Sequence, residues 1–171
     1  MGTKDPQRFV ETMLPVVRQC AEASLIFYGR VANLGKSADT SLIGTMAQNA
    51  SAAFTAIDGA VQDIILGVAL QHFADVRCIA EENTPLRRRF QGRGSDYAII
   101  LDPIDGTLHF QKGDGPYHIS LGLAYRGAMV AAIVARPTED KLFTATRSEG
   151  AYLQHGSRRR RRLTLPRAAA T

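Results

Sequence analysis

Two stretches in the first half of the chain carry apolar or small residues at helical spacing. In the first, residues of about 6–31, these positions are Phe9, Met13, Val16, Val17, Cys20, Ser24, Phe27 and Val31. In the second, roughly 56–73, they are Ile57, Val61, Ile64, Ile65, Val68 and Phe73. The first pattern predicts one long amphipathic helix, and the second predicts another helix. Pro6 suits the first turn of the first helix, because its missing N–H would have no partner there.

The second half of the chain alternates short apolar runs with turn residues. The runs predict strands at 76–80, 97–101, 117–125, 128–136 and 141–146. Pro103 is expected to end the second strand, and Arg126-Gly127 and residues 137–140 have turn chemistry. Two helices followed by strands that pair in sequence predict an α+β fold. We expect two long helices packed on a largely antiparallel sheet.

Two segments fit neither pattern. Residues 33–53 are small and polar, which predicts a long loop; such loops are usually functional or disordered. From Gln154 onward no further element is evident, and Arg158–Arg162 form an uninterrupted basic run. We therefore predict one lobe at 1–153 and a disordered basic tail at 154–171.

The net charge of +5 comes from this tail, since it holds six arginines and no acidic residue. The rest of the chain is nearly neutral, so a basic face for nucleic acid is not indicated. The run itself fits either a tail that binds nucleic acid or an acidic surface, or a disordered end left by truncation or a shifted frame. We favour the second interpretation.

A length of 171 residues with 45% hydrophobic residues suits one globular domain. No apolar run has the length of a membrane span, and the N-terminus lacks a secretory pattern, so we expect a cytoplasmic protein with no membrane partner. Cys20 and Cys78 are too few for a disulfide framework or a thiolate metal site.

The segment Asp102-Pro103-Ile104-Asp105-Gly106-Thr107 is the strongest candidate for chemistry. A carboxylate at the end of a rigid apolar strand is held at the sheet edge, and a second carboxylate follows three residues later. Gly106 allows a close approach of backbone to a ligand, and a helix beginning near Thr107 would offer N–H groups to a phosphate. Carboxylates beside such a seat favour Mg²⁺.

Two further acids are candidates for the same site. Glu81 ends the strand at 76–80, and two neighbouring strand ends would bring it near Asp102. Asp58, in the first turn of the second helix, is placed to bond Thr107. Each feature alone has a simpler interpretation: a turn for Asp102–Thr107, a solvated pair for Glu81-Glu82, and a dipole-favoured acid for Asp58. Their combination favours the site.

Three segments in this order resemble the inositol monophosphatase family, within the lithium-sensitive, fructose-bisphosphatase-like superfamily of magnesium-dependent phosphatases. They are Thr55-Ala56-Ile57-Asp58, Ala80-Glu81-Glu82 and Asp102-Pro103-Ile104-Asp105-Gly106-Thr107. The resemblance runs from about Leu25 to Leu153. It implies the N-terminal half of the αβαβα sugar-phosphatase fold and hydrolysis of a small phosphate monoester, such as inositol monophosphate or a related sugar or nucleotide phosphate.

The resemblance also implies a role for each residue. The side chains of Glu81, Asp102 and Asp105 and the carbonyl of Ile104 would hold Mg²⁺ ions. The backbone N–H groups of Gly106 and Thr107 would bind the substrate phosphate. Asp58 with Thr107 would help to activate the attacking water, and Glu82 would be a supporting carboxylate. The implied partner is a small phosphorylated substrate; a homodimer is compatible with the resemblance, and nucleic acid is not an expected partner.

The sequence departs from the family pattern in several places. Ala80 stands where the family usually has glycine, and Leu108-His109-Phe110 stand where it often has Thr-Asn-Phe. The chain has no Trp and nothing after Leu153 that resembles the family's Trp-Asp-containing C-terminal lobe. An alternative function is therefore a truncated member that binds metal without turnover. A third is a nucleic-acid-binding module that uses the arginine run.

Overall fold

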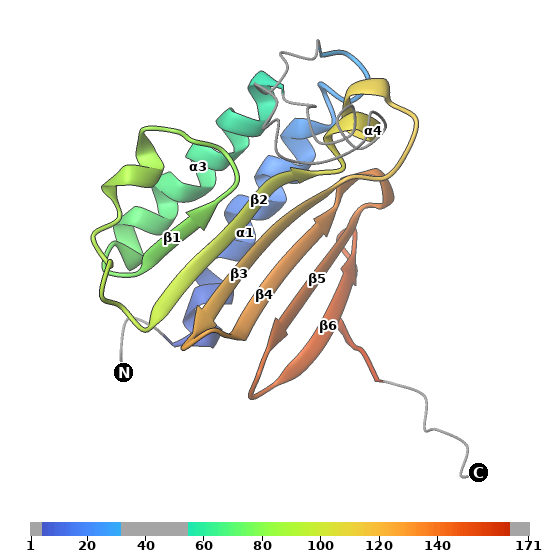
Figure 1. The fold of residues 1–171 in the computed structure, drawn as a ribbon. Helices are drawn as coiled ribbons and strands as arrows, with labels where there is room; N and C mark the ends of the chain where they lie inside the picture. The colour runs from blue at the N-terminus through green and yellow to red at the C-terminus, as the bar shows by residue number, and fades with distance from the viewer. Residues whose placement is uncertain (1–4, 32–54, 165–171) are drawn as a thin grey trace, which may run out of the picture.

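The computed structural model describes residues 5–31 and 55–164. Two helices, α1 (Pro6–Ser24) and α3 (Ala56–Phe73), lie on one face of a seven-stranded sheet (Figure 1). The strands, which are neighbours in chain order, are β1 (Arg77–Ala80), β2 (Tyr97–Asp105), β3 (His118–Tyr125), β4 (Ala128–Arg136), β5 (Lys141–Thr146), β6 (Gly150–His155) and β7 (Arg161–Arg162). Short helical segments are η1 (Leu86–Arg89), α4 (Thr107–Lys112) and η2 (Pro137–Glu139). The predicted α+β fold is confirmed.

The sheet is antiparallel except at one edge. β1 pairs with β2 in parallel, with Ala80 opposite Leu101, and every later pair of neighbouring strands is antiparallel. Because β1 and β2 run in the same direction, their carboxyl ends lie side by side at the same end of the sheet. The chain segments that follow these two ends carry the candidate acids.

Helix α1 begins as predicted and ends earlier than predicted. Its N-cap Asp5 accepts the N–H of Gln7 at 2.9 Å, and Pro6 occupies the first helical position. The sequence pattern extended this helix to residue 31, but the structure ends it at Ser24. Beyond Ser24 the chain turns, and Phe27 is 41% exposed rather than part of the apolar stripe.

Helix α3 has the predicted bounds. Its N-cap Thr55 and Asp58 form a capping box, in which the Asp58 side chain accepts the Thr55 N–H and the Thr55 hydroxyl accepts a first-turn N–H. The two helices meet through Phe9 and Phe73, whose ring centroids are 5.4 Å apart in an edge-to-face arrangement. Cys20 is buried on α1 and Cys78 is half-buried on β1, and both thiols are free.

Strand β2 does not end at Pro103 as the sequence suggested. It continues to Asp105, with an irregular register against β3 between Asp102 and Asp105. The proline is tolerated because β1 ends at Ala80, opposite Leu101, so beyond that point β2 has no ladder on this side that would need its N–H. The irregularity bends the strand where the two aspartates lie.

The prediction of a disordered tail from residue 154 is wrong as far as residue 164. β6 continues to His155, and β7 pairs with it through Arg162 opposite Tyr152 and Arg161 opposite Leu153. Arg160 stacks over the ring of Tyr152, with its guanidinium carbon 4.6 Å from the centroid. Arg161 and Arg162 thus form an edge strand, where positive charge discourages pairing with another sheet.

Two other predictions fall partly outside the described residues. The expected loop at 33–53 and the end of the tail, 165–171, are not among them. Within the described ranges, no helix combines the length and the apolar character that crossing a bilayer requires.

Helices α1 and α3 lie on one face of the sheet (Figure 1). On the opposite face, apolar side chains are exposed. Ile79 is 50% exposed, Ile100 38% and Met129 48%. An open hollow of about 370 Å³ lies on this face, and Glu81 and Asp102 line it together with apolar residues of β1 to β4. The candidate acids therefore border an apolar surface.

Candidate metal and phosphate site

Glu81 and Asp102 meet at the carboxyl end of the parallel pair. The N–H of Glu81 donates to the carbonyl of Leu101 at 3.1 Å, which extends the β1–β2 ladder by one residue. This bond fixes Glu81 beside Asp102, and the two carboxyl groups share a hydrogen bond. The predicted contact between these two acids is therefore present.

The environment of Asp102 disfavours its charged form. Burial, followed by the charge of Glu81, the hydrogen bond with Glu81 and the charge of Asp105, raises the pKa of Asp102 from 3.8 to about 7. A hydrogen bond from the backbone N–H of Ile104 opposes this rise. Oδ1 of Asp102 is buried and has no hydrogen-bond partner among the described residues. A cation placed there would neutralise the carboxylates and satisfy this oxygen.

Asp105 lies near this pair but points elsewhere. Its side chain is 59% exposed, and its Oδ2 lies 3.8 Å from Nδ1 of His118, the residue paired with it on β3. Within residues 5–31 and 55–164, no group of three or more His, Cys, Asp and Glu side chains is arranged to hold a metal ion. The predicted meeting of three acids is thus present as a contacting pair, with the third close by. Sequence analysis gave His118 no role.

Thr107 links the loop after β2 to helix α3. Its hydroxyl lies 2.8 Å from the carbonyl oxygen of Ile104 and 3.2 Å from Oδ1 of Asp58. Asp58 is fully buried and also accepts bonds from the Thr55 N–H at 2.9 Å and the Thr55 hydroxyl at 2.5 Å. Burial raises the pKa of Asp58, and the bonds from Thr55 and Thr107 oppose that rise. The predicted Asp58–Thr107 contact is confirmed.

Gly106 makes the turn from β2 into α4. It is the N-cap of that helix with φ +94°, and a Cβ there would lie 3.1 Å from the carbonyl oxygen of Pro116. Helix α4 then begins at Thr107, where sequence analysis expected a short helix. Glycine is therefore required both by the backbone conformation and by the close approach of the neighbouring chain.

A set of aromatic contacts anchors α4, and sequence analysis did not find it. The rings of Phe110 and Tyr117 lie edge to face with centroids 4.8 Å apart, and Tyr28 stacks on Tyr117 at 5.6 Å. The Tyr28 hydroxyl donates to the carbonyl of Gly115 at 2.7 Å and accepts its N–H at 3.0 Å. The Tyr117 hydroxyl bonds that of Ser24 at 2.7 Å. These residues tie the end of α1 to the loop that flanks the candidate phosphate seat.

A second missed contact lies behind Glu81. The side-chain amide of Gln62, on α3, pairs with the backbone N–H and carbonyl of Glu82. Glu82 itself is buried, which agrees with a supporting position rather than a solvated one. Only the fold brings Gln62 to this segment, because 20 residues separate them.

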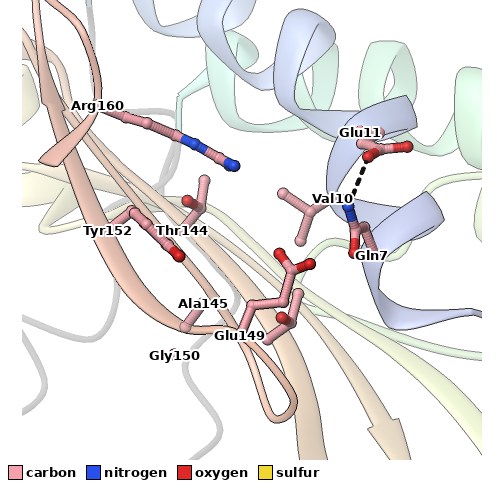
Figure 2. A pocket seen from close by; sticks show the side chains of 10 residues that line it. Gln7, Val10, Glu11, Thr144, Ala145, Glu149, Gly150, Tyr152 and Arg160 are labelled. Atoms are coloured by element: carbon pink, nitrogen blue, oxygen red, sulfur yellow. Dashed lines mark hydrogen bonds between the residues drawn. The ribbon is translucent and has the colours of Figure 1, made fainter. Parts of the chain in front are cut away.

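A second hollow lies far from these residues, between the first turns of α1 and the β5–β6 hairpin (Figure 2). Gln7 and Glu11 line it from α1, and Glu149 and Arg160 from the other side. Its volume of about 20 Å³ has room for a water molecule and not for a phosphate ester. The candidate site therefore remains at the β1–β2 end.

A model of the inositol monophosphatase family matches residues 11–168. The chain belongs to this family. The membership confirms the resemblance found in the motifs, and the match extends beyond Leu25–Leu153 on both sides. It includes β7, which agrees with the ordered edge strand at Arg161–Arg162.

The alignments between this chain and individual relatives cover only part of each relative's length. The Nus factor SuhB of Pasteurella multocida (strain Pm70) is 34% identical over 99 residues, which are 58% of this chain and 36% of that protein. Inositol monophosphatase 1 of Solanum lycopersicum is 33% identical over 99 residues, with the same shares. The solved IMPase of Thermotoga maritima shares the fold, with a TM-score of 0.71 at 24% identity, and the match covers 93% of this chain and 54% of that one. The chain thus spans little more than half of the solved structure.

In this inositol monophosphatase family member, the raised pKa of Asp102 predicts that the stability depends on pH. Because the pKa of Asp102 is about 7 in the folded chain and near 3.8 when unfolded, the folded form binds more protons between these values. The free energy of unfolding should therefore fall as pH rises from about 4 to about 7. The expected fall is about 2 kcal/mol, which is less than the full pKa difference implies because solvent screens part of the interaction. Urea unfolding in EDTA across this range measures it.

The control for this measurement is Asp102→Asn, which removes the titrating group. The variant should lack this component of the pH dependence, so the difference between the two curves isolates Asp102 from other acids such as Glu139, whose pKa is lowered. Parallel curves for the two proteins would contradict the expected contribution of Asp102.

The turn at Gly106 predicts a second effect. Gly106→Ala should lower the free energy of unfolding by about 2–3 kcal/mol, because it combines positive φ with a close contact. Gly127→Ala is the matched control, since Gly127 has φ +80° and nothing lies within 4 Å of a Cβ there. It should cost about 1 kcal/mol. Equal urea midpoints for the two variants would show that the Pro116 contact has no effect.

Proposed function

We propose that the chain hydrolyses a small phosphate monoester, an inositol monophosphate or a related sugar or nucleotide phosphate, in a reaction that depends on Mg²⁺. The observation that carries the proposal is the hydrogen-bonded contact of Glu81 and Asp102, in which Asp102 Oδ1 is buried without a partner among the described residues. Two carboxylates in contact favour a cation beside them, and hard oxygen ligands favour Mg²⁺. Family membership supports phosphatase chemistry.

The candidate donors are all oxygen atoms, which is the ligand type that Mg²⁺ prefers. Glu81, Asp102 and the Ile104 carbonyl would hold one ion and Asp105 a second. The Ile104 carbonyl has two lone pairs, and both are available to an ion when the Thr107 hydroxyl donates to Asp58 instead. Bound Mg²⁺ supplies positive charge that stabilises phosphoryl oxygens and lowers the pKa of a water molecule. Glu82, which is buried, would be a supporting carboxylate.

Thr107 and Asp58 are placed to orient the attacking water. The Thr107 hydroxyl has one hydrogen and two lone pairs, so when it donates to Asp58 it accepts a hydrogen bond from water. Burial raises the pKa of Asp58 and so increases its affinity for a proton passed through that hydroxyl. The backbone N–H groups of Gly106 and Thr107 would bind the phosphate at the start of α4.

The direct test is phosphate release by the purified chain. Inositol 1-phosphate, a sugar phosphate and a nucleotide 3′-phosphate are incubated with Mg²⁺ and, in parallel, with EDTA. Turnover of at least one ester in Mg²⁺ and none in EDTA supports the proposal. The absence of turnover with every ester at saturating Mg²⁺ contradicts it.

A second candidate is a family member that binds metal without turnover. The observation that favours it is the short span, since the aligned residues cover 36% of the curated relatives. Titration calorimetry separates the candidates, because Mg²⁺ binding without hydrolysis supports only the second. A chain that neither binds Mg²⁺ nor hydrolyses an ester contradicts both.

A further inference from the structure

We infer that Gln62 is a positioning residue that fixes Glu81 against Asp102 through the backbone of Glu82. The expected effect of Gln62 on Mg²⁺ affinity rests on the proposed function. Its expected effect on the backbone at Glu82 does not. The Gln62 side chain is fully buried on α3. Its hydrogen bonds go to the backbone of Glu82 and to the Thr84 hydroxyl, so its effect on Glu81 passes through the Glu82 peptide groups.

The side-chain amide of Gln62 bonds both backbone groups of Glu82, as a neighbouring strand would. Nε2 of Gln62 donates to the carbonyl of Glu82 at 2.7 Å, and Oε1 accepts the N–H of Glu82 at 2.8 Å. Nε2 also donates to the hydroxyl of Thr84 at 3.1 Å. One amide thus satisfies both backbone groups of a residue that has left the sheet, and each bond is formed where few waters compete.

The position of this contact in the chain explains its effect on Glu81. The N–H of Glu81 bonds Leu101 of β2, and the next N–H, that of Glu82, bonds Gln62 of α3. The peptide groups before and after the Glu81 Cα are therefore held from different elements. With both fixed, the Cα–Cβ direction of Glu81 is set, so only side-chain torsions remain to bring its carboxyl group beside Asp102.

Strand β1 cannot do this alone. It is four residues long, it pairs only with β2, and it ends at Ala80, one residue before the acid. Without Gln62, the segment after Ala80 would lose the bonds at the Glu82 N–H and carbonyl and gain freedom to rotate. Fixing a ligand through its backbone lowers the conformational entropy lost on binding, so the loss of that support weakens binding.

The test compares two variants of α3. Gln62→Met keeps a long unbranched side chain and removes its hydrogen bonds to Glu82 and Thr84. Ile65→Val is the control, because Ile65 is also fully buried, lies one turn further along α3 and has an entirely apolar side chain. Both are examined at a temperature where circular dichroism shows each to be folded.

Two readouts are required. In the metal-free protein, amide hydrogen exchange at Glu82 should accelerate more than about tenfold in Gln62→Met and remain within about twofold of the parent in Ile65→Val. In calorimetry, Mg²⁺ affinity should fall about 10- to 100-fold in Gln62→Met only. A role limited to stability would lower the melting temperature of both variants and leave the Mg²⁺ affinity unchanged, which would overturn the inference.

The result remains interpretable if the proposed function fails. If the parent chain binds no Mg²⁺, crystal structures of the parent and Gln62→Met decide the inference instead. Displacement of the Glu81 carboxyl group from Asp102 in the variant supports it. An unmoved Glu81, or unchanged exchange at the Glu82 amide, overturns it.

Discussion

Asp102→Asn should reduce Mg²⁺ affinity by more than about 100-fold. Replacing a residue that only supports a metal ligand costs up to about 100-fold, so replacing a ligand should cost more. The substitution keeps the shape of the side chain and removes the charge and one acceptor oxygen of the buried group that contacts Glu81. Hydrolysis, where the parent chain shows it, should fall to the level measured in EDTA. Calorimetric titration with Mg²⁺ at pH 8, above the raised pKa of Asp102, is the measurement.

Asp114→Asn is the matched control for this change. Asp114 is an exposed aspartate of the loop after α4, and its carboxylate pairs with His109 at 2.8 Å. It has the same charge as Asp102 and lies outside the β1–β2 end, so its replacement should change Mg²⁺ affinity by less than about twofold, as expected for a screened surface charge. Equal affinities for the parent and Asp102→Asn would remove Asp102 from the site and with it the basis of the proposed function.

Phe110→Ala should lower the free energy of unfolding by about 3–5 kcal/mol. Phe110 is the buried residue of α4, and its ring packs edge to face on Tyr117 and near Tyr28. Truncation leaves a cavity under a helix of only six residues, which has little stability of its own. Urea unfolding followed by circular dichroism measures the change.

The control here is Lys112→Ala, an exposed position of the same helix. It should change the unfolding free energy by less than about 0.5 kcal/mol. Amide exchange should also show greater loss of protection in α4 than in β4 for Phe110→Ala. A loss below about 1 kcal/mol would mean that Phe110 is not the anchor of α4.

Features that depend on local chemistry could be predicted from the sequence. Helix α3 has apolar residues at helical spacing and a capping box at Thr55, so both its type and its bounds follow from neighbouring residues. Strands β4 and β5 are bounded by turn residues and were likewise predicted at their observed bounds. The Asp102–Thr107 segment identified the family because its residues are contiguous.

Features that depend on distant partners could not be predicted in this way. The early end of α1 involves Ser24, which bonds Tyr117, 93 positions away. The passage of β2 through Pro103 depends on β1 being short, and the order of Arg161–Arg162 depends on pairing with β6. In each case the local signal was correct as a preference, and a tertiary contact decided the outcome.

The candidate site shows the same division. The Asp58–Thr107 contact was found because the family motifs specify both residues, and the structure confirms it at 3.2 Å. The orientation of Asp105 toward His118 depends on the register of β2 against β3, which includes an irregularity. No feature of the sequence around His118 signals that register, because a histidine at a strand end is compatible with many neighbours.

The apolar surface on the sheet face opposite the helices has a practical consequence for biophysical work on this chain. Ile79, Ile100 and Met129 offer a native binding place for hydrophobic dyes such as ANS, whose fluorescence usually signals a molten globule. A bright dye signal from a freshly purified sample would then be compatible with a well-packed core. Near-ultraviolet circular dichroism of the tyrosines is the better indicator of native packing, and a Met129→Lys variant would show how much of the dye signal the surface accounts for.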